Sequence, residues 1–505
     1  MKKTTLDDAE RQFREADPDR DKITDGETLS ALRRNEDGDA ELFIMQNRDR
    51  LRYDHQAGRW FIFDGHHWTL DRLDEATASV CGVVDVYLQE SARQAWLRRK
   101  AAKAEDTKAE KQHAAIEKQL FVRTRELHTA HRKRCVLRIA RVGADGLGLT
   151  GDEWDADTML LGVENGVVDL RTGDHRPGQP SDYIKTYAPT AWLGLDVPSP
   201  TWKRALSEIF AADEELTAYI QRLLGYAITA TVKEHILLVA WGRGRNGKGT
   251  VFETLHHVLG GALAGPVEAE MLLSQKYAKA SGGPSSDIMA LRGKRIIWGS
   301  ETGQGRSLDP GKVKWLTGGD TLTGRQPYAV DQISFPPTHT LFLLTNHRPH
   351  AASNDYALWH RLHLIPFTMS FVRDPERPHE RQVDPDLPAK LKAEASGILA
   401  WLVRGCLEYQ RTGLNPPETV KAATREYRKD EDIIGHFIDE CCILEQAART
   451  SGGDLYKAYR TWCESTGHRP LSGVRFGKDM KERFDCDEGR KIYYLGVGLL
   501  DGNTA

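Results

Sequence analysis

The stretch HILLVAWGRGRNGKGTVFETLHHVL, residues 235–259, predicts the fold at the centre of this 505-residue chain. It begins with an apolar run typical of a buried strand and ends with the apolar spacing of an amphipathic helix. The glycine-rich turn between them brings backbone N–H groups and a helix N-terminus to one place, where phosphate oxygens can bind. We therefore predict a nucleotide-binding loop that consists of Gly242, Arg243, Gly244, Arg245, Asn246, Gly247, Lys248, Gly249 and Thr250.

The end of this loop predicts how ATP and Mg²⁺ are held. Lys248 has the position and length to reach the β- and γ-phosphates. In most such loops a residue with a hydroxyl group follows the lysine and binds Mg²⁺, but here Gly249 follows it. Thr250 or a water molecule must then supply the contact, and we predict Thr250 as a metal ligand.

Three later segments contain candidates for ATP hydrolysis. RIIWGSETG predicts a strand that ends near Glu301, and HTLFLLTNHRPH predicts one that ends near Asn346. Because ligands bind at the carboxyl ends of parallel strands, we predict that Glu301 is the acid that holds Mg²⁺ and that Asn346 positions the attacking water. Arg361, before the apolar run LHLIPF, is predicted to reach the ATP of a neighbouring subunit. The alternatives are a solvated Glu301, a turn residue at Asn346 and a surface ion pair at Arg361.

Four regions are predicted along the chain. The first 40 residues carry 12 acidic and 8 basic side chains, so we expect an acidic, partly disordered arm over residues 1–45. Residues 46–200 combine hairpin-like segments with a helical stretch and predict an α+β domain. Residues 201–414 alternate strands and helices, as expected for an α/β ATPase core. The prolines of NPPET then mark the start of a C-terminal domain, residues 415–505.

Composition excludes several classes of protein. Lys and Arg total 70 against 73 Asp and Glu, so the net charge of −3 provides no overall basic field, and a nucleic-acid partner must be held by local patches. The seven cysteines form no CxxC motif, no apolar run is long enough to span a bilayer, and the first residues lack a signal-peptide pattern. We expect a protein of the reducing cytoplasm that does not contact a membrane.

One stretch is strongly basic. Residues 97–141 contain 14 Lys and Arg and 5 Asp and Glu. A solvated helical face and a basic collar that contacts nucleic-acid backbone both remain open as explanations.

Five segments in a fixed order resemble the superfamily 3 helicases, and more narrowly the helicase part of phage and plasmid primases and of poxvirus-type primase-helicases. They are GRGRNGKGT, RIIWGSETG, KVKWLTGGDTLTGR, LFLLTNHRP and DYALWHRLHLIPF. The upstream segments ENGVVDLRTGDHRP and RLLGYAITA resemble the domain that precedes the helicase in that family, and LYKAYRTWCESTGHRPLS resembles its winged-helix-like C-terminal region.

The resemblance implies a multidomain α/β protein with a P-loop, AAA+-like core, and an ATP-dependent DNA helicase that acts in phage, prophage or plasmid replication in a bacterial host cytoplasm. It implies a homo-oligomeric ring, usually a hexamer, with ATP between subunits and single-stranded DNA in the channel. In this pattern Lys248 is the P-loop lysine, Glu301 the Walker B acid, Asn346 the sensor and Arg361 the arginine that acts in trans. The residues that it suggests for DNA contact are Lys314, Arg325, Tyr328, His347 and Arg348. For Lys314 and Arg325, phosphate sensing and a place at the subunit interface remain open as alternatives. The segment 325–337 is expected to form a hairpin that points into the channel.

The C-terminal domain has a second implied partner. Its basic residues fit a winged helix that contacts duplex DNA, or the domain is a plain structural cap; these residues are Arg469, Arg475, Lys478 and Lys481. Because about 45 residues precede the recognisable part, we expect no primer synthesis by this chain and leave room for a separate primase as partner. The alternative functions are an initiator ATPase that melts an origin, and a switch or defence ATPase that unwinds nothing.

Overall fold

The computed structural model describes residues 23–275, 285–300, 303, 305–325 and 332–500. The chain divides into two compact units, residues 1–168 with 175–187, and residues 169–174 with 188–505. The second unit thus begins before the predicted boundary at residue 201. Within the described residues, no helix has both the length and the apolar character that crossing a bilayer requires.

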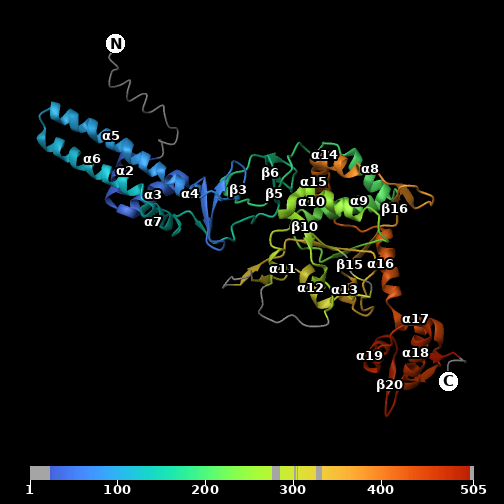
Figure 1. The fold of residues 1–505 in the computed structure, drawn as a ribbon. Coiled ribbons are helices and arrows are strands. Elements are labelled where there is room, and N and C mark those ends of the chain that lie inside the picture. The colour runs from blue at the N-terminus through green and yellow to red at the C-terminus, as the bar shows by residue number, and fades with distance from the viewer. Residues whose placement is uncertain (1–22, 276–284, 301–302, 304, 326–331, 501–505) are drawn as a thin grey trace. The chain divides into compact units, whose positions relative to one another are not determined.

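Helices and a shared core dominate the first unit (Figure 1). The helices are α2 (Asp25–Arg33), α3 (Asn35–Asn47), α4 (Glu75–Ser79), α5 (Cys81–Lys103), α6 (Thr107–Leu127) and α7 (Ala130–Ala140). Leu32 and Phe43 are buried in one cluster with Tyr87 and Leu120. The prediction of an arm that extends to residue 45 is therefore wrong for residues 25–45. Charge dominates the composition there, yet the few apolar side chains are spaced so that they reach the core.

Two small sheets complete the first unit. One has the strand order β3-β2-β1-β4, and the other has the order β7-β6-β5-β8. The strands are β1 (Leu51–Asp54), β2 (Arg59–Phe63), β3 (Trp68–Leu70), β4 (Gly148–Leu149), β5 (Leu160–Val163), β6 (Gly166–Asp169), β7 (His175–Arg176) and β8 (Tyr187–Ala188). The predicted hairpins on either side of the helical stretch are confirmed.

A buried ion-pair network ties the helices of the first unit together. Asp39 of α3 is fully buried and lies 2.9 Å from Arg123 Nη1 and 2.7 Å from Arg132 Nη2. It also accepts a hydrogen bond from the hydroxyl of Tyr87 at 2.8 Å. Arg123 and Arg132 of the basic stretch therefore stabilise the core of this unit. They are part of neither a solvated helical face nor a collar that contacts nucleic acid.

We expect Asp39→Ala to destabilise the first unit by about 3–5 kcal/mol, because it removes the buried carboxylate that two largely buried guanidinium groups share and leaves them only the more exposed Glu126 and Glu36. Chemical denaturation followed by far-UV circular dichroism measures the loss. The matched control is Glu126→Ala, which removes a half-exposed carboxylate from the same Arg123 and should cost no more than about 1 kcal/mol. Equal losses in the two variants would contradict a structural role for Asp39.

The second unit is built on a parallel sheet with the strand order β10-β11-β14-β9-β15. Its strands are β9 (Leu237–Trp241), β10 (Ala264–Val267), β11 (Ile296–Ser300), β14 (Thr340–Thr345) and β15 (Leu362–Pro366). Helices cover both faces, so the strands are apolar along their whole length rather than alternating (Figure 1). The predicted α/β core with a parallel sheet is confirmed.

The two faces of this sheet have different helical covers. Leu237 and Val239 point into a cluster with residues of α12 (Pro310–Thr317), α13 (Tyr356–Trp359) and α16 (Glu418–Asp430). The opposite face, with Ala240, contacts α9 (Glu214–Ala227) and α10 (Lys248–Leu263). Further elements of the unit are α8 (Pro200–Ile209), α11 (Ser286–Met289), β12 (Leu322–Gly324), β13 (Ile333–Phe335), β16 (Ser370–Val372), β17 (Glu380–Gln382), α14 (Leu387–Ala393) and α15 (Ala395–Thr412).

The predicted C-terminal boundary at residue 415 needs correction. In α16, Tyr427 is buried against Trp359 with ring centroids 5.0 Å apart, and Thr424 accepts a hydrogen bond from the backbone N–H of Leu364 at 3.0 Å. This helix therefore belongs to the sheet, although the prolines before it suggest a break. A separate hydrophobic cluster begins only at residues 433–434.

The C-terminal residues have their own small core. Its elements are α17 (Ile433–Cys441), β18 (Cys442–Ile443), β19 (Arg449–Ser451), α18 (Gly452–Thr466), α19 (Gly473–Arg483), β20 (Cys486–Glu488), β21 (Ile492–Leu495) and β22 (Gly498–Leu499).

Candidate nucleotide-binding site

The predicted loop joins the carboxyl end of β9 to the first turn of α10. Gly244 and Gly247 have φ values of 96° and 84°, which favour glycine strongly. A Cβ atom on Gly247 would also lie 2.6 Å from the side chain of Ile209. The chain can thus turn sharply here and present the N-terminus of α10, whose unpaired N–H groups and dipole favour an anion.

Lys248 and Asn346 meet at this loop. The Lys248 ammonium donates hydrogen bonds to the carbonyl of Gly242 at 2.7 Å and to Oδ1 of Asn346 at 3.2 Å. Burial lowers the pKa of Lys248 to about 8. Asn346 follows β14, which pairs with β9 so that Thr345 lies beside Trp241. Two residues 98 positions apart are brought together because their strands are neighbours in the sheet.

The predicted metal ligands are partly described. Thr250 lies in the first turn of α10, and its neighbour Gly249 has open space where a Cβ would stand. Glu301 lies outside the described residues, although Ser300 before it pairs with Leu344 at the same edge of the sheet as Asn346. A hydroxyl and a carboxylate are oxygen donors of the kind that Mg²⁺ prefers, so this donor set fits the ion.

A cavity of about 580 Å³ opens beside the loop. Thr250 and Gly247 line it together with residues that the sequence analysis did not single out, namely Ile209, Phe371 and Arg373. Its volume lies within the usual range for small-molecule sites. No motif marks these three residues, because α8 and β16 reach the loop only through the fold.

Arg361 lies at the other end of the sheet. Its carbonyl accepts a hydrogen bond from the N–H of Leu237 at 2.8 Å, at the start of β9, whereas the loop follows the end of that five-residue strand. The separation is about 16 Å at 3.3 Å per residue, more than an arginine side chain spans. Its Nη1 donates to Ala357 O at 3.0 Å, and its buried Nε has no hydrogen-bond partner among the described residues.

Two of the suggested DNA contacts are held by protein partners instead. The guanidinium of Arg348 stacks 4.2 Å from the ring centroid of Trp241 and pairs with Asp430 at 2.7 Å. Lys314 pairs with Asp355 at 2.9 Å. Burial opposes ionisation of Asp355, but hydrogen bonds from Lys314 and from backbone N–H groups lower its pKa overall. Both cations therefore stabilise the fold and are poorly placed to contact DNA in this conformation.

The remaining DNA candidates surround a hairpin. β12 and β13 pair antiparallel, so the expected hairpin begins at Leu322 rather than at Arg325. Arg325 follows β12, and its N–H donates to Ser285 Oγ at 2.9 Å. Tyr328 lies outside the described residues. His347 is exposed beside Asn346, and its predicted contact with DNA stays a prediction.

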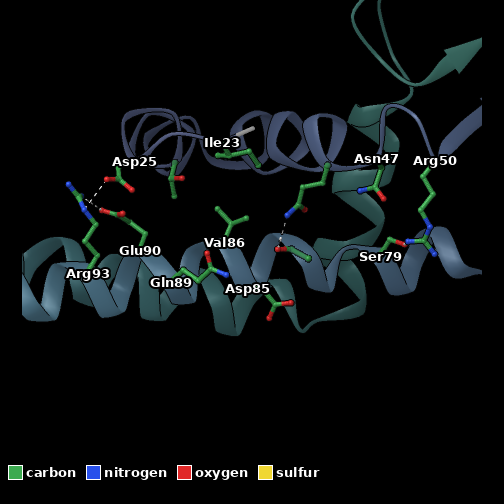
Figure 2. Close-up of a pocket in the computed structure, with 13 residues that line it drawn as sticks. Ile23, Asp25, Asn47, Arg50, Ser79, Asp85, Val86, Gln89, Glu90 and Arg93 are labelled. Carbon is green, nitrogen blue, oxygen red and sulfur yellow. Dashed lines mark hydrogen bonds and ion pairs between the residues drawn. The ribbon is translucent and has the colours of Figure 1, made fainter. Parts of the chain in front are cut away.

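A second cavity, of about 320 Å³, lies in the first unit between α2, α3 and α5 (Figure 2). Figure 2 shows Arg93 at one end, between Asp25 and Glu90, at 2.9 and 3.2 Å. Arg50 at the other end contacts Ser79 at 3.2 Å. Protein groups thus already bind the two arginines at the ends of the cavity, and we assign the cavity no ligand.

Two family models match the chain. The model described as "D5 N terminal like" matches residues 40–211, and the model described as "Poxvirus D5 protein-like" matches residues 429–488. The chain thus carries a D5 N-terminal-like region and a poxvirus D5-like region, and its resemblance to poxvirus-type primase-helicases is confirmed.

Individual relatives agree with this. "Putative helicase L207/L206" of Acanthamoeba polyphaga mimivirus is 29% identical over 82% of this chain and 44% of its own length. "Putative helicase 022R" of Frog virus 3 is 24% identical over 70% of this chain and 42% of its own. "Putative primase C962R" of African swine fever virus (isolate Warthog/Namibia/Wart80/1980) is 26% identical over 61% and 33%. The chain spans less than half the length of these relatives.

Among solved structures, the apo C-terminal region of NrS-1 is similar, with 11% sequence identity, a TM-score of 0.35, and coverage of 60% of this chain and 78% of that one.

Proposed function

We propose that this chain is an ATP-driven DNA helicase of phage, prophage or plasmid replication. One observation carries the proposal: the Lys248 ammonium and the Asn346 amide, which follow the ends of two neighbouring parallel strands, lie 3.2 Å apart at the mouth of a glycine-rich loop. A cation at this place holds the β- and γ-phosphates, and an amide beside it orients water toward the γ-phosphate.

The other groups of the site follow from this placement. Thr250 and Glu301 hold Mg²⁺, which neutralises charge on the phosphates. The apolar side chains of Ile209 and Phe371 receive the base, and Arg245 and Arg373 face the phosphates and ribose across the same cavity. When ATP binds, Lys248 exchanges its hydrogen bond with the Gly242 carbonyl for phosphate oxygens.

The position of Arg361 favours a site shared between subunits. The side chain cannot reach the loop of its own chain, and it carries a buried nitrogen without a partner among the described residues. An arginine that completes the ATP site of the next subunit explains why Arg361 lies so far from the loop of its own chain. We infer a homo-oligomeric ring, a hexamer in the simplest case, with single-stranded DNA in its channel and the β12–β13 hairpin directed at the DNA.

ATP turnover with and without single-stranded DNA, measured across protein concentration, tests the function. We expect DNA to stimulate turnover, turnover to rise more steeply than linearly as rings assemble, and a forked duplex to be unwound with one polarity. Turnover that ignores DNA, or depends on a protein partner instead, would favour a switch ATPase.

A separate experiment tests whether Thr250 is the residue that binds Mg²⁺. If Thr250 binds Mg²⁺, Thr250→Ala should raise the Mg²⁺ concentration for half-maximal turnover by roughly tenfold, since one oxygen ligand is lost. Gly249→Ser should fit without a clash, because a Cβ there meets no atom within 4 Å, and should rescue Thr250→Ala. An unchanged Mg²⁺ requirement in Thr250→Ala would assign the contact to water.

A further inference from the structure

The C-terminal residues 433–500 have the order of elements found in winged helices. The helix α17 is followed by β19, then by α18 and α19, and finally by the β20–β21 hairpin. The three strands form an antiparallel sheet in the order β19-β21-β20. In this arrangement α18 and α19 form a helix-turn-helix, and α19 is the helix that such motifs place in the major groove of DNA.

The packing of α19 determines which of its faces is free. Phe476 and Met480 are buried, and the Phe476 ring lies 4.8 Å from that of Tyr459. The hydroxyl of Tyr494, on β21, donates to the carbonyl of Gly477 at 3.0 Å and ties the helix to the hairpin. The outward face therefore carries Val474, which is 87% exposed, and the exposed Arg475 and Lys478.

Four cations on α19 and the hairpin have no ion-pair partner among the described residues. Arg475 and Lys478 lie on the helix, and Arg490 and Lys491 lie at the hairpin tip, all exposed. Lys481 differs from them because it is paired with Glu488 of β20. Of the basic residues that the sequence suggests for DNA contact, Lys481 is therefore excluded. Arg490 and Lys491 of the hairpin are added.

We propose that α19 and the β20–β21 hairpin form a site for double-stranded DNA. The N-terminal half of α19 enters the major groove, where Val474 contacts base edges and Arg475 and Lys478 contact bases or phosphates. Arg490 and Lys491 bind the backbone beside it. The exposed acid Glu482 lies in the C-terminal half of the helix and keeps that half away from the phosphates.

Duplex DNA fits this surface better than a single strand does. Binding of single strands relies on exposed aromatic rings that stack on bases. Among the described residues of α19, β20 and β21, Phe476 and Tyr494 are buried and Tyr493 is only partly exposed beneath Arg449. This site goes beyond the proposed ATP-driven function, because it needs neither nucleotide nor Lys248.

The test is fluorescence anisotropy of the full chain with a labelled duplex and with a single strand of the same length, without nucleotide. We expect Arg475→Ala/Lys478→Ala and Arg490→Ala/Lys491→Ala each to weaken duplex binding by about tenfold or more, and to lower the slope of log affinity against log salt by about 2. Lys481→Ala removes a cation that is also exposed but is paired with Glu488, and it should change affinity less than about twofold. Stimulation of ATP turnover by single strands should stay at the wild-type level in all three variants.

Several outcomes would overturn the proposal: no duplex binding by the wild type, equal losses in the Lys481→Ala control, or weakening of single-strand binding by the same factor. Lys248→Ala separates the two proposals. If only the helicase proposal is wrong, Lys248→Ala still binds duplex DNA. If only the duplex proposal is wrong, ATP turnover of the wild type is still stimulated by single-stranded DNA. Val474→Asp, at an exposed position that cannot disturb the core, should also weaken duplex binding.

Discussion

Replacing Lys248 with alanine should abolish ATP turnover and weaken nucleotide binding by at least about a hundredfold. The ammonium is held at the start of α10 by the Gly242 carbonyl and Asn346, so it is already aligned with the phosphate position. Its loss removes the charge that compensates the β- and γ-phosphates in a partly desolvated site, where such contacts are strong. Isothermal titration with ATP and steady-state turnover measure the two effects.

Lys294 provides a matched control for this variant. It too is a partly buried lysine of the second unit, its pKa is lowered by burial, and its ammonium donates to a backbone carbonyl, that of Gly261, at 2.7 Å. Lys294→Ala should keep nucleotide affinity and turnover near wild-type values. Comparable losses in both variants would mean that Lys248 acts on stability rather than on ATP.

Arg361→Ala should leave ATP binding within about twofold of wild type but reduce hydrolysis by about 10³-fold or more, the usual effect of removing an arginine that stabilises the transition state. The physical reason is its distance from its own loop, which leaves only a neighbouring subunit's ATP within reach. Turnover under saturating ATP, with binding measured in parallel, separates the two effects.

Mixing variants tests the shared site directly. A ring assembled from equal amounts of Lys248→Ala and Arg361→Ala subunits contains intact sites at about a quarter of its interfaces, because lysine and arginine come from different subunits. Turnover should therefore reappear in the mixture although each variant alone is inactive. If the mixture stays inactive, or if Arg361→Ala hydrolyses ATP normally, the shared-site ring is wrong.

The sequence by itself determined the centre of the fold. An apolar strand, a glycine-rich turn and an amphipathic helix within residues 235–259 depend on local pattern, and β9 and α10 lie where that pattern predicts them. The carboxyl ends of later apolar runs likewise located Asn346, because a parallel sheet has one ligand-binding edge. Charge-rich composition failed at α2 and α3, where a few buried apolar side chains outweigh many solvated ones.

Only the tertiary structure decided which charged residues have partners. Arg123 and Arg132 belong to a basic run, yet Asp39 holds them in the core; Arg348 follows a ligand-binding strand, yet Trp241 and α16 hold it. Lys481 and Lys478 look alike in sequence, but Glu488 pairs with the first alone among the described residues. An ion pair depends on distances between segments far apart in the chain, and local sequence contains no record of those distances.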